Sequence, residues 1–167
     1  PLYLQSSKIL RELLGNAHPD FAISLNNLAT LYSSMKEYDK VEPLYLQALK
    51  ITREAFGEEH SSYVASLSNL AGIYTEIGAY EKAESMYLKA LKVDGKIFGE
   101  EHTSYAFDLN NLAVLYVSMG AYDKAKPFLI QALNIRKKIL GEEHQDYVST
   151  LNNLTWFHGA QGKHEKA

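Results

Sequence analysis

The sequence predicts an all-α fold, a right-handed α-solenoid of antiparallel helix pairs, and two observations support this prediction. A stretch of six residues, SLNNLA at 24–29, returns as SLSNLA at 66–71, DLNNLA at 108–113 and TLNNLT at 150–155. The interval is 42 residues each time, and a strict period in this range is typical of stacked repeats. Each period also holds two segments whose apolar residues recur at the spacing of one helix face.

Each repeat is therefore expected to contain a first helix, helix A, then a short turn and a second helix, helix B. A glycine follows every helix B, beginning with Gly15, and glycine is common just after the end of a helix. We expect residues 1–167 to form one array, with helix B of a preceding repeat at 1–14. The remaining parts are full helix pairs at 20–56, 62–98 and 104–140, helix A of a last repeat at 146–161, and a truncated helix B at 163–167.

Two positions depart from the pattern expected of such helices. The turn between helix A and helix B contains Gly78 or Gly120, which suits a left-handed residue, but Lys36 takes that place in the first pair. Gly95 lies well inside a helix B. Because a glycine there costs about 1 kcal/mol relative to alanine, we expect a local weak point.

A histidine precedes every helix A. A metal site shared between repeats is excluded by distance, because neighbouring helices pack about 8–10 Å apart whereas metal ligands lie within about 2.5 Å of one ion. We expect each histidine to pack against or cap the start of helix A, and the glutamates before it to favour the positive end of that helix. The histidines are His18, His60, His102 and His144.

The composition argues against several classes of function. The net charge is −3 and cysteine is absent, so nucleic acid, membranes and thiolate chemistry are not expected. No apolar run approaches the roughly 18 residues of a membrane span, and we expect a cytoplasmic protein. His158 and His164 have no partners at a spacing typical of a catalytic triad, and no phosphate-binding glycine loop is present. We therefore expect neither an enzyme nor a cofactor.

The residues at the recurring positions resemble those of the tetratricopeptide repeat family. In the second pair, these are Leu67, Leu70, Ala71, Tyr74, Gly78, Tyr80, Ala83, Tyr87, Ala90 and Leu91. The 42-residue period, with Gly-Glu-Glu-His before helix A and Leu-Asn-Asn-Leu-Ala inside it, is similar to kinesin light chains. It also resembles bacterial arrays that are fused to signalling or protease domains. The last repeat departs from the pattern at Thr155, His158 and His164. Either it is an atypical terminal repeat, or these polar groups meet a part of the protein outside this sequence.

Asparagine recurs inside helix A although it is a mediocre helix former. The asparagines lie on a face turned away from helix B, which would be the concave wall of a solenoid. The resemblance implies that an asparagine there contacts the main chain of a bound peptide. The alternative is that each asparagine bonds the neighbouring repeat and holds the superhelical pitch. The candidate binding residues on this face are Asn26, Asn27, Asn69, Phe107, Asn110, Asn111, Val114, Asn152, Asn153 and Trp156.

The predicted wall is small and polar in the first two repeats and more apolar in the last two. The later repeats add Phe107, Val114, Val117 and Trp156, and Glu76 is the only charge placed on the wall. Large aromatic side chains on such a surface are typical anchors for a partner.

We therefore expect a non-enzymatic protein–protein interaction module that binds a peptide or partner segment in a concave groove. An alternative is a regulatory or sensor arm of a larger enzyme or signalling protein, such as a fusion to a protease or an NTPase. A third hypothesis is self-association through the unfinished terminal repeats.

Overall fold

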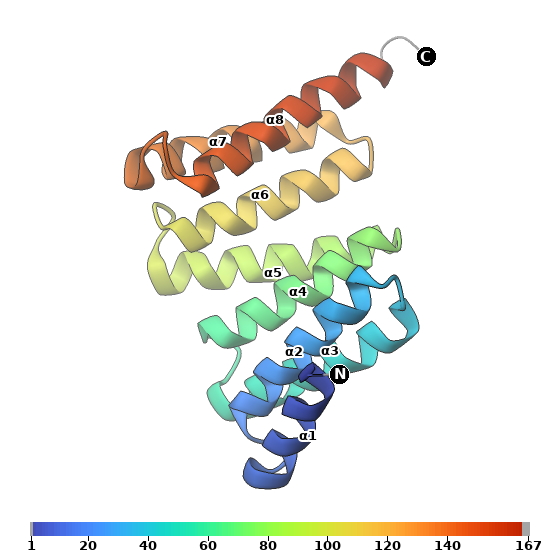
Figure 1. Cartoon of the computed structure of the whole chain (residues 1–167). Helices are drawn as coiled ribbons and strands as arrows, with labels where there is room; N and C mark the ends of the chain where they lie inside the picture. Colours follow the sequence, from blue (N-terminus) through green and yellow to red (C-terminus); the bar gives the residue numbers. More distant parts are fainter. Residues whose placement is uncertain (1, 165–167) are drawn as a thin grey trace. The chain divides into compact units, whose positions relative to one another are not determined.

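The computed structural model describes residues 2–164, and within that range the regular structure is entirely α-helical (Figure 1). The helices form two compact units, divided in the sequence between Ala79 and Tyr80. The first unit contains α1 (Leu2–Leu14), α2 (Pro19–Ser34), α3 (Tyr38–Phe56) and α4 (Ser61–Glu76). The second contains α5 (Tyr80–Phe98), α6 (Thr103–Ser118), α7 (Tyr122–Leu140) and α8 (Gln145–His164). The predicted all-α fold class is confirmed.

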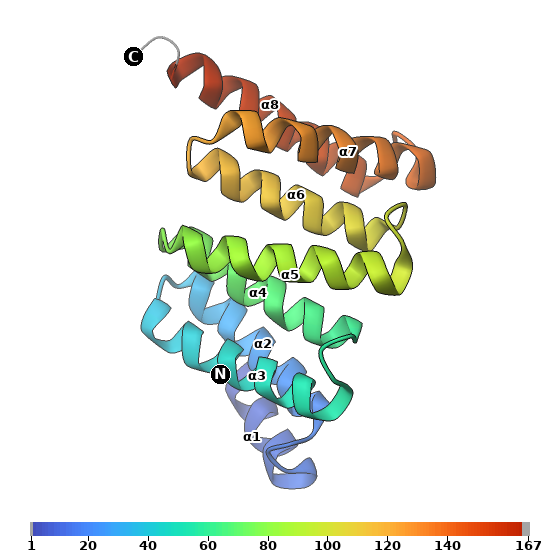
Figure 2. The same ribbon diagram turned by 180° about the vertical axis from the view of Figure 1, so that it is seen from behind.

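Within each unit, every helix packs against the next helix in the chain, and the chain reverses direction between them (Figures 1 and 2). The helices A are α2, α4, α6 and α8, and the helices B are α1, α3, α5 and α7. Successive helices A also touch, α2 against α4 and α6 against α8. Each helix A is therefore held by neighbours on two sides, which leaves a third side for solvent or for a partner.

The cores of the two units repeat one apolar contact. In each unit a helix A contributes an alanine and a leucine, and the following helix B contributes an alanine and an isoleucine. These residues are Ala22, Leu25, Ala48 and Ile51 in the first unit, and Ala106, Leu109, Ala132 and Ile135 in the second. The small alanines let the two helix backbones approach each other closely, while the larger side chains fill the space beside them.

The predicted histidine caps are confirmed. Before each helix A, the Nδ1 atom of the histidine accepts a hydrogen bond of 3.1–3.2 Å from the backbone N–H two residues later. This bond satisfies one of the N–H groups that the first helical turn leaves free. The ring of His60 also stacks on Phe56 with centroids 4.3 Å apart, and His102 stacks on Phe98 at 4.5 Å. These histidines therefore join the end of one helix to the start of the next.

Gly95 has a packing role that the sequence did not reveal. α5 passes through it without a break, so glycine does not end the helix. A Cβ atom built on Gly95 would lie 3.2 Å from Cε2 of Tyr105, which is tighter than an ordinary contact. The missing side chain therefore lets the ring of Tyr105 rest against the backbone of α5.

The end of α8 differs from the prediction. A break after residue 161 was expected, but α8 continues through Gly162 to His164. In the pairs α2–α3 and α6–α7, helix B folds back and packs against its helix A, which offsets the cost of interrupting the helix. The rest of the predicted truncated helix B, residues 165–167, lies outside the described residues.

Candidate partner-binding faces of the helices A

In the first unit, the candidate face runs along α2 and α4. Asn27 and Asn69 occupy equivalent places on these helices, and both side chains are exposed. Ile23 lies one turn before Asn27 and is 58% exposed. The sequence-based description of this wall as small and polar therefore overlooked one large apolar side chain.

In the second unit, the candidate face runs along α6 and α8 and is more apolar. Phe107 is 51% exposed and Trp156 is 46% exposed. Phe107, Asn111 and Val114 follow one another at helical spacing along α6, and the last two are half-buried. Trp156 occupies on α8 the place that Val114 has on α6, so aromatic rings lie on both helices of this face.

Val117 is not part of this face. It is only 4% exposed. Val117 lies three residues after Val114 on α6, and its side chain points into the packed interior of the unit. Glu76, the one charge expected on the wall, is exposed near the end of α4, where its Oε2 atom accepts a hydrogen bond of 3.1 Å from Oγ of Ser33.

Some of the candidate asparagines join successive helices A. Nδ2 of Asn26 donates to Oγ of Ser66 at 3.2 Å and so links α2 to α4. Nδ2 of Asn153 donates to Oδ1 of Asn110 at 2.9 Å and links α8 to α6. Asn110 is only 8% exposed, and Asn26 and Asn153 are half-buried. These contacts support the alternative in which asparagines fix the arrangement of neighbouring repeats.

The other candidate asparagines remain accessible. Asn27, Asn69 and Asn152 are exposed, and Asn111 is half-buried. The asparagines therefore divide into a group that holds helices together and a group that faces solvent.

The charges of the helices A are sparse. Lys and Arg are absent from residues 19–34, 61–76, 103–118 and 145–160, and they concentrate on the helices B. A partner lying on the candidate faces would mainly meet amides, hydroxyls and apolar side chains.

The side of the helices A that meets a helix B has its own polar contacts. Oη of Tyr74 donates to Oε1 of Glu42, and Oη of Tyr116 donates to Oε1 of Glu84, both at 2.6 Å. Burial, reinforced by these bonds to a carboxylate, raises the pKa of both tyrosines to about 12. In the last repeat, the exposed His158 takes the place of the tyrosine.

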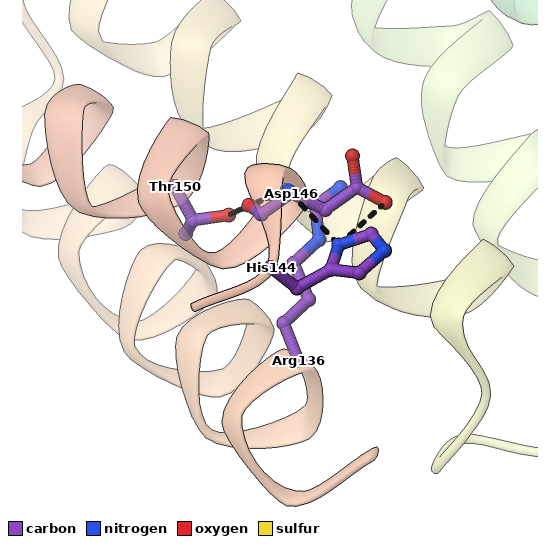
Figure 3. Close-up of polar contacts among 4 residues, drawn as sticks. All are labelled: Arg136, His144, Asp146 and Thr150. Atoms are coloured by element: carbon purple, nitrogen blue, oxygen red, sulfur yellow. Dashed lines mark hydrogen bonds and ion pairs between the residues drawn. The ribbon is translucent and has the colours of Figure 1, made fainter. Parts of the chain in front are cut away.

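From α3 onward, a buried polar position lies between a helix B and the following helix A, and the residue there changes along the chain. In α7 it is Arg136, whose Nη1 atom donates to the backbone oxygen of Asp146 at 2.9 Å and to Oγ1 of Thr150 at 2.5 Å (Figure 3). Burial lowers the pKa of Arg136, and the charge of Asp146 opposes this effect. The arginine thus anchors the first turns of α8 to α7.

The same position is occupied by an acid pair between α5 and α6. Asp94 is 5% exposed and Asp108 is 1% exposed, and their carboxyl groups are hydrogen-bonded to each other. Such a bond requires a proton on one of the two carboxyls. Burial raises the pKa of Asp94, while His102 and the bond with Asp108 oppose the shift. The pair is enclosed between helices, which indicates a structural rather than a ligand-binding role.

The described residues include no cluster of three or more His, Asp or Glu side chains that could hold a metal ion. Among the helices described, none is both long enough and apolar enough to cross a membrane.

Helix pairs joined by repeated contacts define a solenoid repeat protein. The model of the tetratricopeptide repeat family matches residues 1–54, 20–96, 63–138 and 105–167, so the chain belongs to this family. Repeats of this family serve as scaffolds for protein–protein interaction. A search of curated proteins finds no match.

Several solved structures are similar to the chain over almost its whole length. BtubC (BKLC) from P. vanneervenii is 32% identical with a TM-score of 0.80, over 99% of this chain and 66% of that one. A putative kinesin light chain of Podosopora anserina, with nearly identical TPR-like repeats, is 25% identical with a TM-score of 0.75, over 99% and 78%. RapI in its apo form is 26% identical with a TM-score of 0.76, over 96% and 56%. The predicted likeness to kinesin-light-chain-type repeats is confirmed, and the chain spans just under two thirds of BtubC.

Proposed function

We propose that the chain is a non-enzymatic binding module and that the helix A face of the second unit takes an extended peptide segment. One observation carries the proposal: exposed Phe107 and Trp156 lie on the same face as the accessible amide of Asn111. Aromatic rings bury apolar side chains of a partner, and an amide both donates to and accepts from a peptide main chain.

The charges of the helices A limit the chemistry of the ligand. Because this face has no Lys or Arg, it offers no partner for an acidic motif or for a terminal carboxylate. We expect a segment that is uncharged where it touches the face and that carries at least one large aliphatic or aromatic side chain for Phe107 and Trp156.

The candidate residues have different roles in this proposal. Asn111 binds the peptide main chain directly, and Val114 and Asn152 line the contact beside it. Asn110 and Asn153 hold α6 and α8 at the spacing that the peptide bridges. In the first unit, Asn27 and Asn69 form an equivalent pair of exposed amides on α2 and α4, while Asn26 acts through its bond to Ser66.

The test uses Trp156, which is the only tryptophan in the chain. Peptides are selected from a display library of random uncharged sequences, and the best binder is titrated into the chain. We expect the emission of Trp156 to move to shorter wavelength, because its ring leaves water. We expect Asn111→Ala to weaken the Kd about tenfold, which corresponds to about 1.4 kcal/mol.

The matched control is Gln131→Ala, which removes an exposed amide from α7, a helix B. It should bind the peptide as the wild type does, and thermal unfolding should show that both variants remain folded. The proposal is wrong if selected peptides leave the Trp156 emission unchanged, or if Asn111→Ala and Phe107→Ala both bind normally.

The alternative, a regulatory arm of a larger protein, concerns sequence outside these residues. The full-length gene decides it, since a protease or NTPase domain beside the array would support this role. Peptide binding to the array would then be expected to change the activity of that domain.

A further inference from the structure

A pocket of about 650 Å³ opens in the first unit among α1, α2 and α3. These three helices follow one another in the chain, and each of them lines part of the pocket. Phe21, Leu25 and Leu28 of α2 form its floor, and they are only 3–5% exposed. The volume lies within the range of about 300–1,000 Å³ that is typical of sites for small molecules.

Two residues of the lining are smaller than their counterparts in the second unit. Ser7 on α1 corresponds to Leu91 on α5, and Leu44 on α3 corresponds to Phe128 on α7. Leu91 and Phe128 pack against the apolar cluster of their unit. Ser7 is buried, but its side chain is too small to fill the same space. The smaller side chains of the first unit therefore leave room for the pocket.

The pocket belongs to the side of α1 that faces the following helices. Its lining includes Ser7 of α1 but not Ser6 or Ile9, which lie on another side of that helix, and α3 contributes Leu44 and Gln47. The pocket is therefore formed by a helix A together with the helix B before it and the helix B after it.

Two positive charges lie beside this pocket. Lys8 and Arg11 lie about one helical turn apart on α1 and are exposed, and none of the residues that line the pocket is acidic. Oε1 of Glu12 lies 3.9 Å from Nζ of Lys8, but both side chains are more than half exposed, so water weakens this ion pair. Gly95 takes the place of Arg11 in the second unit, which therefore lacks this pair of cations.

We propose that the pocket binds a small amphipathic carboxylate, a molecule with an apolar body and one acid group. The apolar body lies against Phe21, Leu25 and Leu44, and the carboxylate binds Lys8 and Arg11. Arginine can bind a carboxylate through two parallel N–H groups, and lysine adds a point charge. Burial of the apolar body supplies affinity, while the two cations select the sign of the ligand's charge.

This site is separate from the peptide-binding face proposed for the second unit, because the two share no residue. The cations of the pocket come from α1, a helix B, whereas the helices A have no Lys or Arg in the ranges given above. The two sites therefore suit ligands of different chemistry, and either site can be tested without the other.

The test uses sodium octanoate as the probe, with octylammonium chloride as a ligand that has the same alkyl chain and the opposite charge. Each is titrated into the 167-residue chain in a calorimeter. We expect octanoate to bind with a Kd below about 1 mM and with the negative heat-capacity change that marks apolar burial. Octylammonium should bind at least about tenfold more weakly, because its charge meets Lys8 and Arg11.

Ser7→Leu introduces the side chain that α5 has at this place. It should lower the affinity for octanoate at least about tenfold, because the protein then fills the pocket itself. Thermal unfolding should show a stability equal to or above that of the wild type, since the added side chain packs on apolar residues. The matched variant Ser7→Ala leaves the pocket open and should bind octanoate as the wild type does.

The charges are tested with the double variant Lys8→Gln and Arg11→Gln, which should weaken octanoate binding about tenfold. Its control is Lys50→Gln with Arg53→Gln, the same two residue types one period later on α3. Lys50 has a matching ion pair with Glu54 at 3.9 Å, but neither Lys50 nor Arg53 lines the pocket. The control should therefore bind octanoate normally.

Three results would each overturn the proposal. These are octanoate binding by the wild type that is weaker than about 1 mM, unchanged binding by Ser7→Leu, and equally tight binding of octylammonium. Asn111→Ala should bind octanoate as the wild type does, so a failure of this proposal can be distinguished from a failure of peptide binding.

Discussion

Asp94 and Asp108 bring two carboxyl groups together between α5 and α6, where the first unit has Thr52 and Ser66 at the equivalent positions. Two hydroxyl groups need no titrating proton to be buried together, but two carboxyl groups do, because like charges in a buried site repel. The second unit therefore contains a pH-dependent contact that the first unit lacks.

The acid pair leads to a prediction for Asp94→Asn, in which Nδ2 donates to Asp108 without a titrating proton. The pKa of Asp94 is raised in the folded state, so the stability from the protonated pair is complete at low pH and is lost as the pH rises through that pKa. We expect Asp94→Asn to increase the free energy of unfolding by about 1 kcal/mol at pH 8 and by less at pH 4. Urea unfolding at both pH values measures this.

The control for this variant is Asp123→Asn, which changes an exposed carboxylate on α7 and should have nearly the same small effect at both pH values. A loss of stability in Asp94→Asn at pH 8 would show that the carboxyl pair is not a source of strain.

Single residues also show how far the sequence can define the candidate site. The histidine caps could be predicted because a cap depends only on its own helix. The asparagines could not be sorted, because Asn26 and Asn27 point about 100° apart on the helix. One turns toward the neighbouring helix A and the other toward solvent. Which of the two bonds a neighbour depends on the contact between α2 and α4, and the sequence alone does not specify that contact.

At the scale of the elements, the turn between helix A and helix B uses a left-handed residue in each full pair. Gly78 and Gly120 adopt φ angles of 78° and 72°, and Lys36 adopts 59°. Lysine has a Cβ atom that clashes with the backbone in this conformation, and glycine does not. The turn between α2 and α3 is therefore strained at Lys36.

We expect Lys36→Gly to raise the free energy of unfolding by about 1 kcal/mol, because the left-handed conformation costs an ordinary residue about 1–2 kcal/mol. Gly120→Ala should lower it by a similar amount. Denaturant unfolding of both variants measures the change. The explanation fails if Lys36→Gly destabilises the chain, since the lysine would then be stabilising through its side chain.

The helices could be predicted almost completely from the sequence, apart from the end of α8. Period, apolar spacing and glycine stops are local signals, and they repeat in every copy. At Gly162 the sequence predicted a break, but α8 continues to His164.

At the scale of the whole molecule, the basic side chains belong to the helices B, the turns and the C-terminal end, while the helices A offer a nearly uncharged face. The fold class followed from the period because every copy must make the same contacts. The identity of a ligand does not follow, because family membership is carried by residues that pack the helices.

This distribution of charge predicts that peptide binding depends little on salt. Screening weakens contacts between charges but hardly affects apolar burial or neutral amide bonds. We expect the Kd of a selected peptide to change less than about threefold between roughly 50 and 500 mM NaCl, as measured by Trp156 fluorescence. A decrease in affinity of about tenfold would indicate that the peptide lies on a helix B instead.

The histidine cap and the glycine stop have a consequence for how such a chain can change over generations. Removing residues 61–102 would join His60 to Thr103, so a capping histidine would again stand before a helix A. Glu42 would meet Tyr116 in place of Tyr74, the same pair of residue types. Recombination between equivalent codons can therefore lengthen or shorten the array by whole repeats without creating a new kind of joint, whereas a deletion of any other length shifts every later contact.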